Sequence, residues 1–199
     1  MSKFIPIVAG ITGTLTVSAV GGYLLSTQNT TIVRNKFKDA IIDLDRENDL
    51  ITKKLTKLKD ASTRPTNLKL KSAQTKEKVS SNSGLNEFKE GCKEIYDSVF
   101  EKKESELFKD FQNYCAKTNK DKIGEGEWAT TGAQWNNRFA KLNQDNTKPI
   151  SPSLIAVSKK ESNNGDSLKR WCDEKADAVF EGDENKEFKD VKSFCGKTD

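Results

Sequence analysis

Residues 85–118 read LNEFKEGCKEIYDSVFEKKESELFKDFQNYCAKT, and residues 165–198 repeat this stretch as GDSLKRWCDEKADAVFEGDENKEFKDVKSFCGKT. With an offset of 80, the two stretches share 14 of 34 residues, and each carries two cysteines 23 positions apart. Such identity between two parts of one chain indicates a structural unit that is used twice. Cysteines paired at matched positions indicate disulfides, and therefore an oxidising compartment.

Apolar residues recur at helical spacing in two segments of each stretch. In the first stretch they are Phe88, Cys92, Ile95 and Val99, then Phe108, Phe111 and Cys115; in the second they are Leu168, Cys172 and Val179, then Phe188, Val191 and Cys195. The residues between the two segments, 101–104 and 181–184, are polar and predict a turn. Each stretch is therefore predicted to be an αα-hairpin.

The cysteine positions favour one disulfide pairing among the three that are possible. Cys92 and Cys115 lie equally far from the centre of their predicted turn, as do Cys172 and Cys195. Packed helices bring such level positions within the Cα separation of about 4.4–6.8 Å that a disulfide needs. We therefore predict Cys92–Cys115 and Cys172–Cys195. The close CxxC spacing typical of zinc and redox sites is absent, so neither a metal nor a cofactor is predicted.

The first 31 residues are predicted to be a membrane anchor or an export signal. Residues 4–25 form a run of 22 without a charge, which as a helix reaches about 33 Å and can cross a hydrocarbon core of about 30 Å. An anchor is favoured over a signal cleaved near residues 19–21, because the run is longer than a usual signal core. Because Lys3 precedes the run, the rest of the chain is expected outside the cell in both cases.

Residues 32–59 are predicted to form an amphipathic or coiled-coil helix. The residues that step by four and three are Phe37, Ile41, Leu44, Asn48, Ile51, Leu55 and Leu58. This heptad is typical of a short parallel coiled coil in which Asn48 fixes the register. Two interpretations remain open: a parallel homodimer through residues 37–58, or a helix packed on the chain's own domain.

Residues 60–84 are predicted to be a flexible basic linker, because this stretch has few aliphatic residues and many Ser, Thr and Lys. From residue 53 to residue 78 there are nine basic and two acidic residues, while the whole chain has a net charge of +4. This stretch could attract phosphates of lipid or nucleic acid, but a solvated linker is favoured, and no specific nucleic-acid partner is predicted.

Residues 85–199 are predicted to be one helical domain that contains both repeats. Between the repeats, aromatic and apolar residues recur at near-helical spacing, and we expect them to be core rather than a binding platform. They are Trp128, Trp135, Phe139 and Leu142, with Trp171 of the second repeat joining them. The fold class is therefore mostly α.

Catalysis is not predicted, and no catalytic residue is assigned. The chain has no histidine, which removes the usual general base and the commonest partner of a Ser or Cys nucleophile. Acids recur in both repeats at Glu94/Glu174, Asp97/Asp177 and Asp110/Asp190, and we expect them to be solvated on exposed helical faces. A hydrolase that uses Glu94 and Asp97 is the remaining enzymatic alternative.

The chain resembles the paralogous small proteins of haemotropic mycoplasmas over its whole length. An MSK start runs into a Gly/Ala/Thr-rich apolar segment, and the most specific element is the terminal LKxWC…F…FKxVKxFC pattern. Its residues are Leu168, Trp171, Cys172, Phe180, Phe188, Val191 and Cys195, and the first repeat departs from it with Gly91 in place of Trp171. The resemblance implies display on the surface of a wall-less parasite of red cells and transfers no catalytic residue.

These observations predict a protein held in the cell membrane by a single span, with its C-terminal part outside, or a secreted protein if the signal is cleaved. The expected role is surface display, as an antigen or as a module that contacts a ligand on the host cell. A structural membrane protein that associates with itself is the main alternative.

Overall fold

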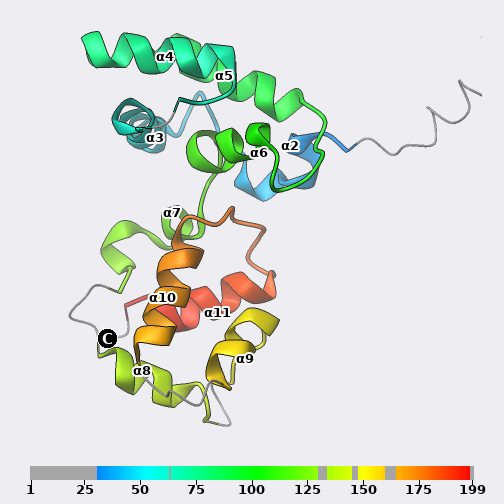
Figure 1. The fold of residues 1–199 in the computed structure, drawn as a ribbon, viewed down its shortest axis with the longest axis vertical. Helices are drawn as coiled ribbons and strands as arrows, with labels where there is room; N and C mark the ends of the chain where they lie inside the picture. Colours follow the sequence, from blue (N-terminus) through cyan, green and yellow to red (C-terminus); the bar gives the residue numbers. More distant parts are fainter. Residues whose placement is uncertain (1–30, 63, 130–133, 145–147, 160–164, 198–199) are drawn as a thin grey trace, which may run out of the picture. The chain divides into compact units, whose positions relative to one another are not determined.

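The computed structural model describes residues 31–62, 64–129, 134–144, 148–159 and 165–197. Residues from Thr31 onward belong to one compact unit. The described part is mostly α-helical and contains isolated β-bridges but no sheet (Figure 1). Among these residues no helix is long and apolar enough to cross a membrane. The predicted span at residues 4–25 lies outside the described residues.

The first half of the unit contains five α-helices, one 3₁₀ turn and one π-helical turn among the described residues. Their bounds are α2 (Val33–Lys36), the 3₁₀ turn η1 (Lys38–Ala40), α3 (Asn48–Asp60), α4 (Leu68–Val79), α5 (Leu85–Asp97), α6 (Glu106–Asp110) and the π-helical turn η2 (Phe111–Cys115). Side-chain oxygens cap two of these helices, since Asn67 accepts from the backbone N–H of Leu70 and Ser105 from that of Phe108. These caps satisfy N–H groups that have no partner inside the helix.

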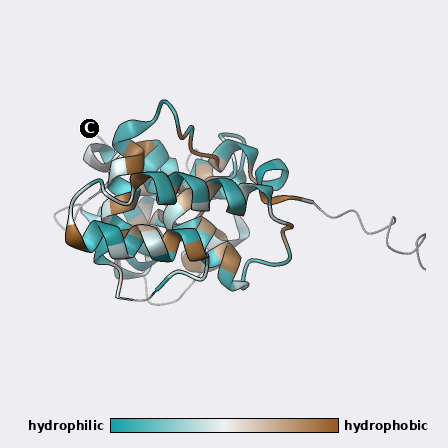
Figure 2. Cartoon of the chain, turned by 90° about the horizontal axis from the view of Figure 1, so that it is seen from above, coloured by the Kyte–Doolittle hydropathy of each residue, from teal (hydrophilic) through white to brown (hydrophobic). Residues whose placement is uncertain are grey.

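The second half repeats this order. Its elements are α7 (Asn119–Ile123), the 3₁₀ turn η3 (Glu125–Glu127), α8 (Trp135–Lys141), α9 (Pro152–Ser158), α10 (Gly165–Ala176) and α11 (Lys186–Cys195). Thr118 and Asp121 form a capping box at the start of α7, and Ser151 and Asn185 cap α9 and α11. Helices in this view carry short runs of hydrophobic positions between hydrophilic ones (Figure 2), as expected for amphipathic helices.

Both predicted disulfides are present. Cys92 bonds Cys115 with a Cα–Cα distance of 5.3 Å, and Cys172 bonds Cys195 at 5.5 Å. The first bridge joins α5 to η2, the second joins α10 to α11, and all four cysteines are fully buried. The predicted hairpin shape needs a correction, because α10 and α11 cross rather than run side by side (Figure 1).

The duplication extends over the whole described structure, well beyond the stretches that are similar in sequence. The bridge between Ile32 and Val99 recurs between Thr118 and Val179, and the bridge between Ile41 and Ala116 recurs between Trp128 and Gly196. The backbone bond from Phe100 N to Thr31 O likewise recurs from Phe180 N to Lys117 O. We therefore divide the unit into copy one (residues 31–116) and copy two (residues 117–197).

Each copy has a hydrophobic core closed by its own disulfide. The core of copy one contains Ile51, Leu55, Leu58, Leu70, Phe88, Ile95 and Phe111 around Cys92 and Cys115. The core of copy two contains Trp128, Trp135, Phe139, Leu142, Leu154, Leu168 and Trp171 around Cys172 and Cys195. The predicted placement of the aromatic residues between the repeats is therefore confirmed, including that of Trp171.

The predicted helix over residues 32–59 is wrong, because the chain breaks it into α2, η1 and α3. The carboxylate of Asp43 accepts from the backbone N–H groups of Asp45 and Arg46, which forms a turn between η1 and α3. The predicted coiled-coil residues Phe37, Leu44, Ile51, Leu55 and Leu58 are buried in the core of copy one. Asn48 is exposed rather than buried in a seam.

The prediction that residues 60–84 form a flexible linker is also wrong, because 12 of them form α4. Leu70 and Ala73 are fully buried. Gln74 is buried as well and donates from Nε2 to the backbone oxygens of Leu58 and Ala61, so it joins α4 to the end of α3. These contacts offset the entropy cost of ordering a polar segment.

Candidate functional site

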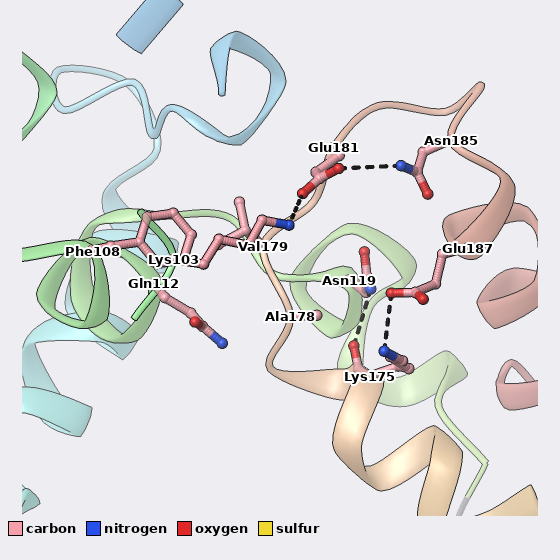
Figure 3. Close-up of a pocket in the computed structure, with 10 residues that line it drawn as sticks. All are labelled: Lys103, Phe108, Gln112, Asn119, Lys175, Ala178, Val179, Glu181, Asn185 and Glu187. Carbon is pink, nitrogen blue, oxygen red and sulfur yellow. Dashed lines mark hydrogen bonds and ion pairs between the residues drawn. The ribbon is translucent and has the colours of Figure 1, made fainter. Parts of the chain in front are cut away.

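The contacts between copy one and copy two, here called the repeat junction, bring together charged residues that are far apart in the sequence. A cavity of about 340 Å³ lies at this junction (Figure 3). Copy one contributes Lys103, Phe108 and Gln112 to its lining. Copy two contributes Asn119, Lys175, Ala178, Val179, Glu181, Asn185 and Glu187.

The charged groups around this cavity pair with one another. Lys103 Nζ lies 2.7 Å from Glu181 Oε1, and Lys175 Nζ lies 3.2 Å from Glu187 Oε1 (Figure 3). Asn185 donates to the other oxygen of Glu181 at 3.3 Å. Two ammonium groups thus neutralise two carboxylates: the Lys103–Glu181 pair joins the two copies, whereas the Lys175–Glu187 pair lies within copy two. Within the described residues, no group of three or more His, Cys, Asp or Glu side chains could hold a metal.

A largely buried ion cluster also belongs to the repeat junction. Lys53 and Lys54 of α3 lie 2.7 and 2.6 Å from the carboxylate of Asp121 in α7. The side chains of Lys54 and Asp121 are only 3 and 4% exposed. Thr118 donates to the same carboxylate through its backbone N–H and its hydroxyl. The cluster fastens α3 of copy one to the start of copy two.

The pKa values of this cluster follow from burial and charge. Burial by itself raises the pKa of Asp121, but the ammonium groups of Lys54 and Lys53 and the Thr118 N–H outweigh it, so the pKa lies below its ordinary value. Burial lowers the pKa of Lys54, and the attraction of Asp121 opposes this shift only in part. The carboxylate is therefore held in its charged form.

The expectation that Asp110 and Asp190 are solvated is wrong. They are only 5 and 3% exposed. Asp110 accepts from the backbone N–H groups of Thr66 and Asn67 at 2.7 Å, just before α4. Asp190 does the same before α9, where it accepts from the N–H groups of Ile150 and Ser151 and from the Ser151 hydroxyl. Burial raises the pKa of Asp110, and the two N–H donors counteract this rise.

The other repeated acids are exposed, as predicted. On α5, Glu94 accepts from the amide of Asn67 at 2.9 Å, and Asp97 pairs with Arg34 at 2.7 Å. Their counterparts are Glu174, which is exposed, and Asp177, which pairs with Lys57 at 3.2 Å. Glu94 and Asp97, the two acids of the hydrolase alternative, therefore lie on an exposed helix surface and do not line the junction cavity.

Sequence reasoning missed the residues that join the copies. Lys53, Lys54 and Lys57 looked like part of a solvated basic linker, yet their partners Asp121 and Asp177 lie 68, 67 and 120 positions further on. One local signal was available: Thr118 and Asp121 have the spacing of a capping box. No local signal identifies the lysines as the other half of the cluster.

Comparison with protein-family models, with curated proteins and with solved structures found no match.

Proposed function

We propose that this chain is a membrane-anchored surface protein whose two disulfide-closed copies form an outward-facing module for contact with other molecules or for antigenic display. The observation that carries the proposal is the pair of buried disulfides, one in each copy. Disulfides persist in oxidising compartments, so they indicate an extracytoplasmic location. The uncharged run at residues 4–25 supplies an anchor or export signal.

Three further points support a binding or display role. The sequence resembles that of surface-displayed proteins of haemotropic mycoplasmas. The charged groups of the junction cavity are used in structural pairs. The apolar residues of the predicted coiled coil serve the chain's own core, so we assign contacts with other molecules to exposed surfaces rather than to a seam at residues 37–58.

Labelling of intact cells tests the proposed location. A membrane-impermeant amine reagent should label exposed lysines such as Lys102 in copy one and Lys192 in copy two. Lys54 serves as an internal control, because its buried side chain should react only after unfolding. Peptide mapping by mass spectrometry reads out all three residues. The proposal is wrong if Lys102 and Lys192 react only after the cells have been lysed.

A further inference from the structure

One five-residue motif recurs at the edge of each copy and has different surroundings in the two. It reads DSVFE at residues 97–101 and DAVFE at residues 177–181. In copy two this motif docks on copy one: Val179 is only 9% exposed and belongs to the core of copy one. Asp177 pairs with Lys57 and Glu181 pairs with Lys103. The DAVFE segment is thus the central contact of the repeat junction.

The same motif faces outward in copy one. Val99 is 48% exposed, although a valine side chain gains most when it is buried. Asp97 is 63% exposed and Glu101 is exposed as well. The DSVFE segment therefore presents a valine between two acids without the neighbouring copy that its counterpart contacts.

Copy two carries the counterpart of the surface that receives the motif. On copy one, Lys103, Phe108 and Gln112 line the cavity beside Val179. The residues 80 positions later are Asp183, Phe188 and Lys192, and all three line a groove of about 360 Å³ together with Ile123 and Lys197. In copy one this surface is covered by copy two. In copy two it forms the wall of the groove, although Phe188 itself is only 4% exposed, like Phe108.

We propose that this groove on copy two receives the DSVFE segment of a second copy of the chain, so that chains associate head to tail. The groove carries Lys122, Lys192 and Lys197 against Glu127 and Asp183, whereas the segment carries two acids. Lys192 stands in this groove where copy one has Gln112, which adds a positive charge against the two acids of the segment. Because the two surfaces differ, the contact is heterologous and leaves one groove and one segment free at the ends.

Two differences make this contact weaker than the repeat junction. Asp183 stands where copy one has Lys103, so it repels Glu101 instead of pairing with it. In addition, the backbone oxygen of Thr31 accepts from Phe100 N–H, as that of Lys117 accepts from Phe180 N–H. Lys197 corresponds to Lys117 at an offset of 80, so Thr31 of the docking chain would occupy the position of Lys197. Docking therefore displaces Lys197 from its backbone bond with Glu127.

Sedimentation of the full-length protein in detergent tests the contact with two variants, each of which disrupts one of the two surfaces. V99E disrupts the DSVFE segment and keeps the groove intact, while K192E disrupts the groove and keeps the segment intact. V99E alone should associate at least about tenfold more weakly than the unmodified chain, the factor that burial of one valine supplies. K192E alone should also associate more weakly, because it places a negative charge opposite the acidic segment. Mixed together, the two variants should form one-to-one dimers through their intact surfaces.

Two further variants complete the test. V79E is the matched control, because Val79 is a valine on α4 that is 85% exposed and lies outside both surfaces. It should associate like the unmodified chain. D183K should tighten association, because it removes the repulsion of Glu101. An unmodified chain that stays monomeric, a mixture of V99E and K192E that stays monomeric, or equal effects of V99E and V79E would overturn the proposal. The contact between chains does not depend on where the protein is located.

Discussion

At the scale of single residues, the carboxylate of Asp121 determines how firmly the two copies are joined. Replacing it with asparagine leaves the buried ammonium of Lys54 without its counter-charge, and breaking a buried pair in this way costs about 3–5 kcal/mol. K54M should cost less, because methionine fills the same space and Lys53 continues to pair with Asp121. Urea unfolding of both variants measures the difference. Equal costs would contradict this account of the cluster.

The same carboxylate predicts a dependence on pH. Its pKa is lower in the folded chain than in the unfolded chain, so its stabilisation is complete above the unfolded value of about 3.9 and is lost as the pH falls below it. Between about pH 5 and pH 2, the free energy of unfolding should therefore fall more steeply for the unmodified chain than for D121N. Parallel curves for the two proteins in this window would show that Asp121 does not have the depressed pKa.

In copy one, the Tyr96 hydroxyl bridges two backbone groups whose counterparts in copy two bond each other directly. Its buried hydroxyl donates to Cys115 O at 2.7 Å and accepts from Ile42 N at 3.4 Å. In copy two the corresponding residue is Ala176, and Ala129 N bonds Cys195 O directly at 2.8 Å. Y96F should destabilise the fold by about 1–3 kcal/mol, because it leaves a buried carbonyl and N–H without a partner.

Tyr114 supplies the matched control for this substitution. It is 5% exposed, and among the described residues its hydroxyl has no hydrogen bond. Y114F should therefore leave the thermal unfolding midpoint nearly unchanged, whereas Y96F lowers it. If the two variants unfold at the same temperature, the bridging role of the Tyr96 hydroxyl is wrong.

At the scale of elements, substitutions in α4 distinguish the observed packed helix from the predicted flexible linker. Leu70 is fully buried on this helix, while Leu68, two positions earlier, is 75% exposed. Leu70→Ala should cost about 2–5 kcal/mol, because it leaves a cavity in the core of copy one. Leu68→Ala should change the free energy of unfolding by less than about 0.5 kcal/mol. Denaturant unfolding of the pair decides the matter, since a flexible linker would tolerate both substitutions equally.

The sequence predicts the helices around the cysteines well, because apolar residues there recur at regular helical spacing. It fails for α4, because much of the buried side of this helix is small or polar: Ala73, Gln74 and Glu77. Glu77 is satisfied by the backbone N–H groups of Asn82 and Gly84, which no local pattern reveals. The heptad at residues 37–58 was misleading for the opposite reason: separate short elements placed their buried residues at coiled-coil spacing by coincidence.

The sequence does not reveal that the first half of each copy is also repeated, because the offset between corresponding residues changes along the chain. The cysteine-bearing helices correspond at an offset of 80, whereas Pro65, Leu58 and Leu70 recur as Pro149, Leu142 and Leu154 at an offset of 84. Lys54 and Arg138, both buried, correspond at the same offset. A search at one fixed offset therefore recovers only the final two helices of each copy.

At the scale of the whole molecule, a tandem duplication explains both the stability of the fold and its free surfaces. Two copies of roughly 80 residues each have a small core. The disulfide in each copy joins cysteines 23 positions apart and adds about 3 kcal/mol. The repeat junction joins them through the Asp121 cluster and the buried Val179. The DSVFE segment of copy one and the groove on copy two are the surfaces that we propose for contact between chains.

The central claim is that each copy is closed by its own disulfide in an oxidising location. Non-reducing peptide mapping of the protein from its native source tests this claim most directly. The account predicts two linked peptide pairs, one containing Cys92 and Cys115 and the other containing Cys172 and Cys195. Four free thiols, or bridges that join copy one to copy two, would contradict it.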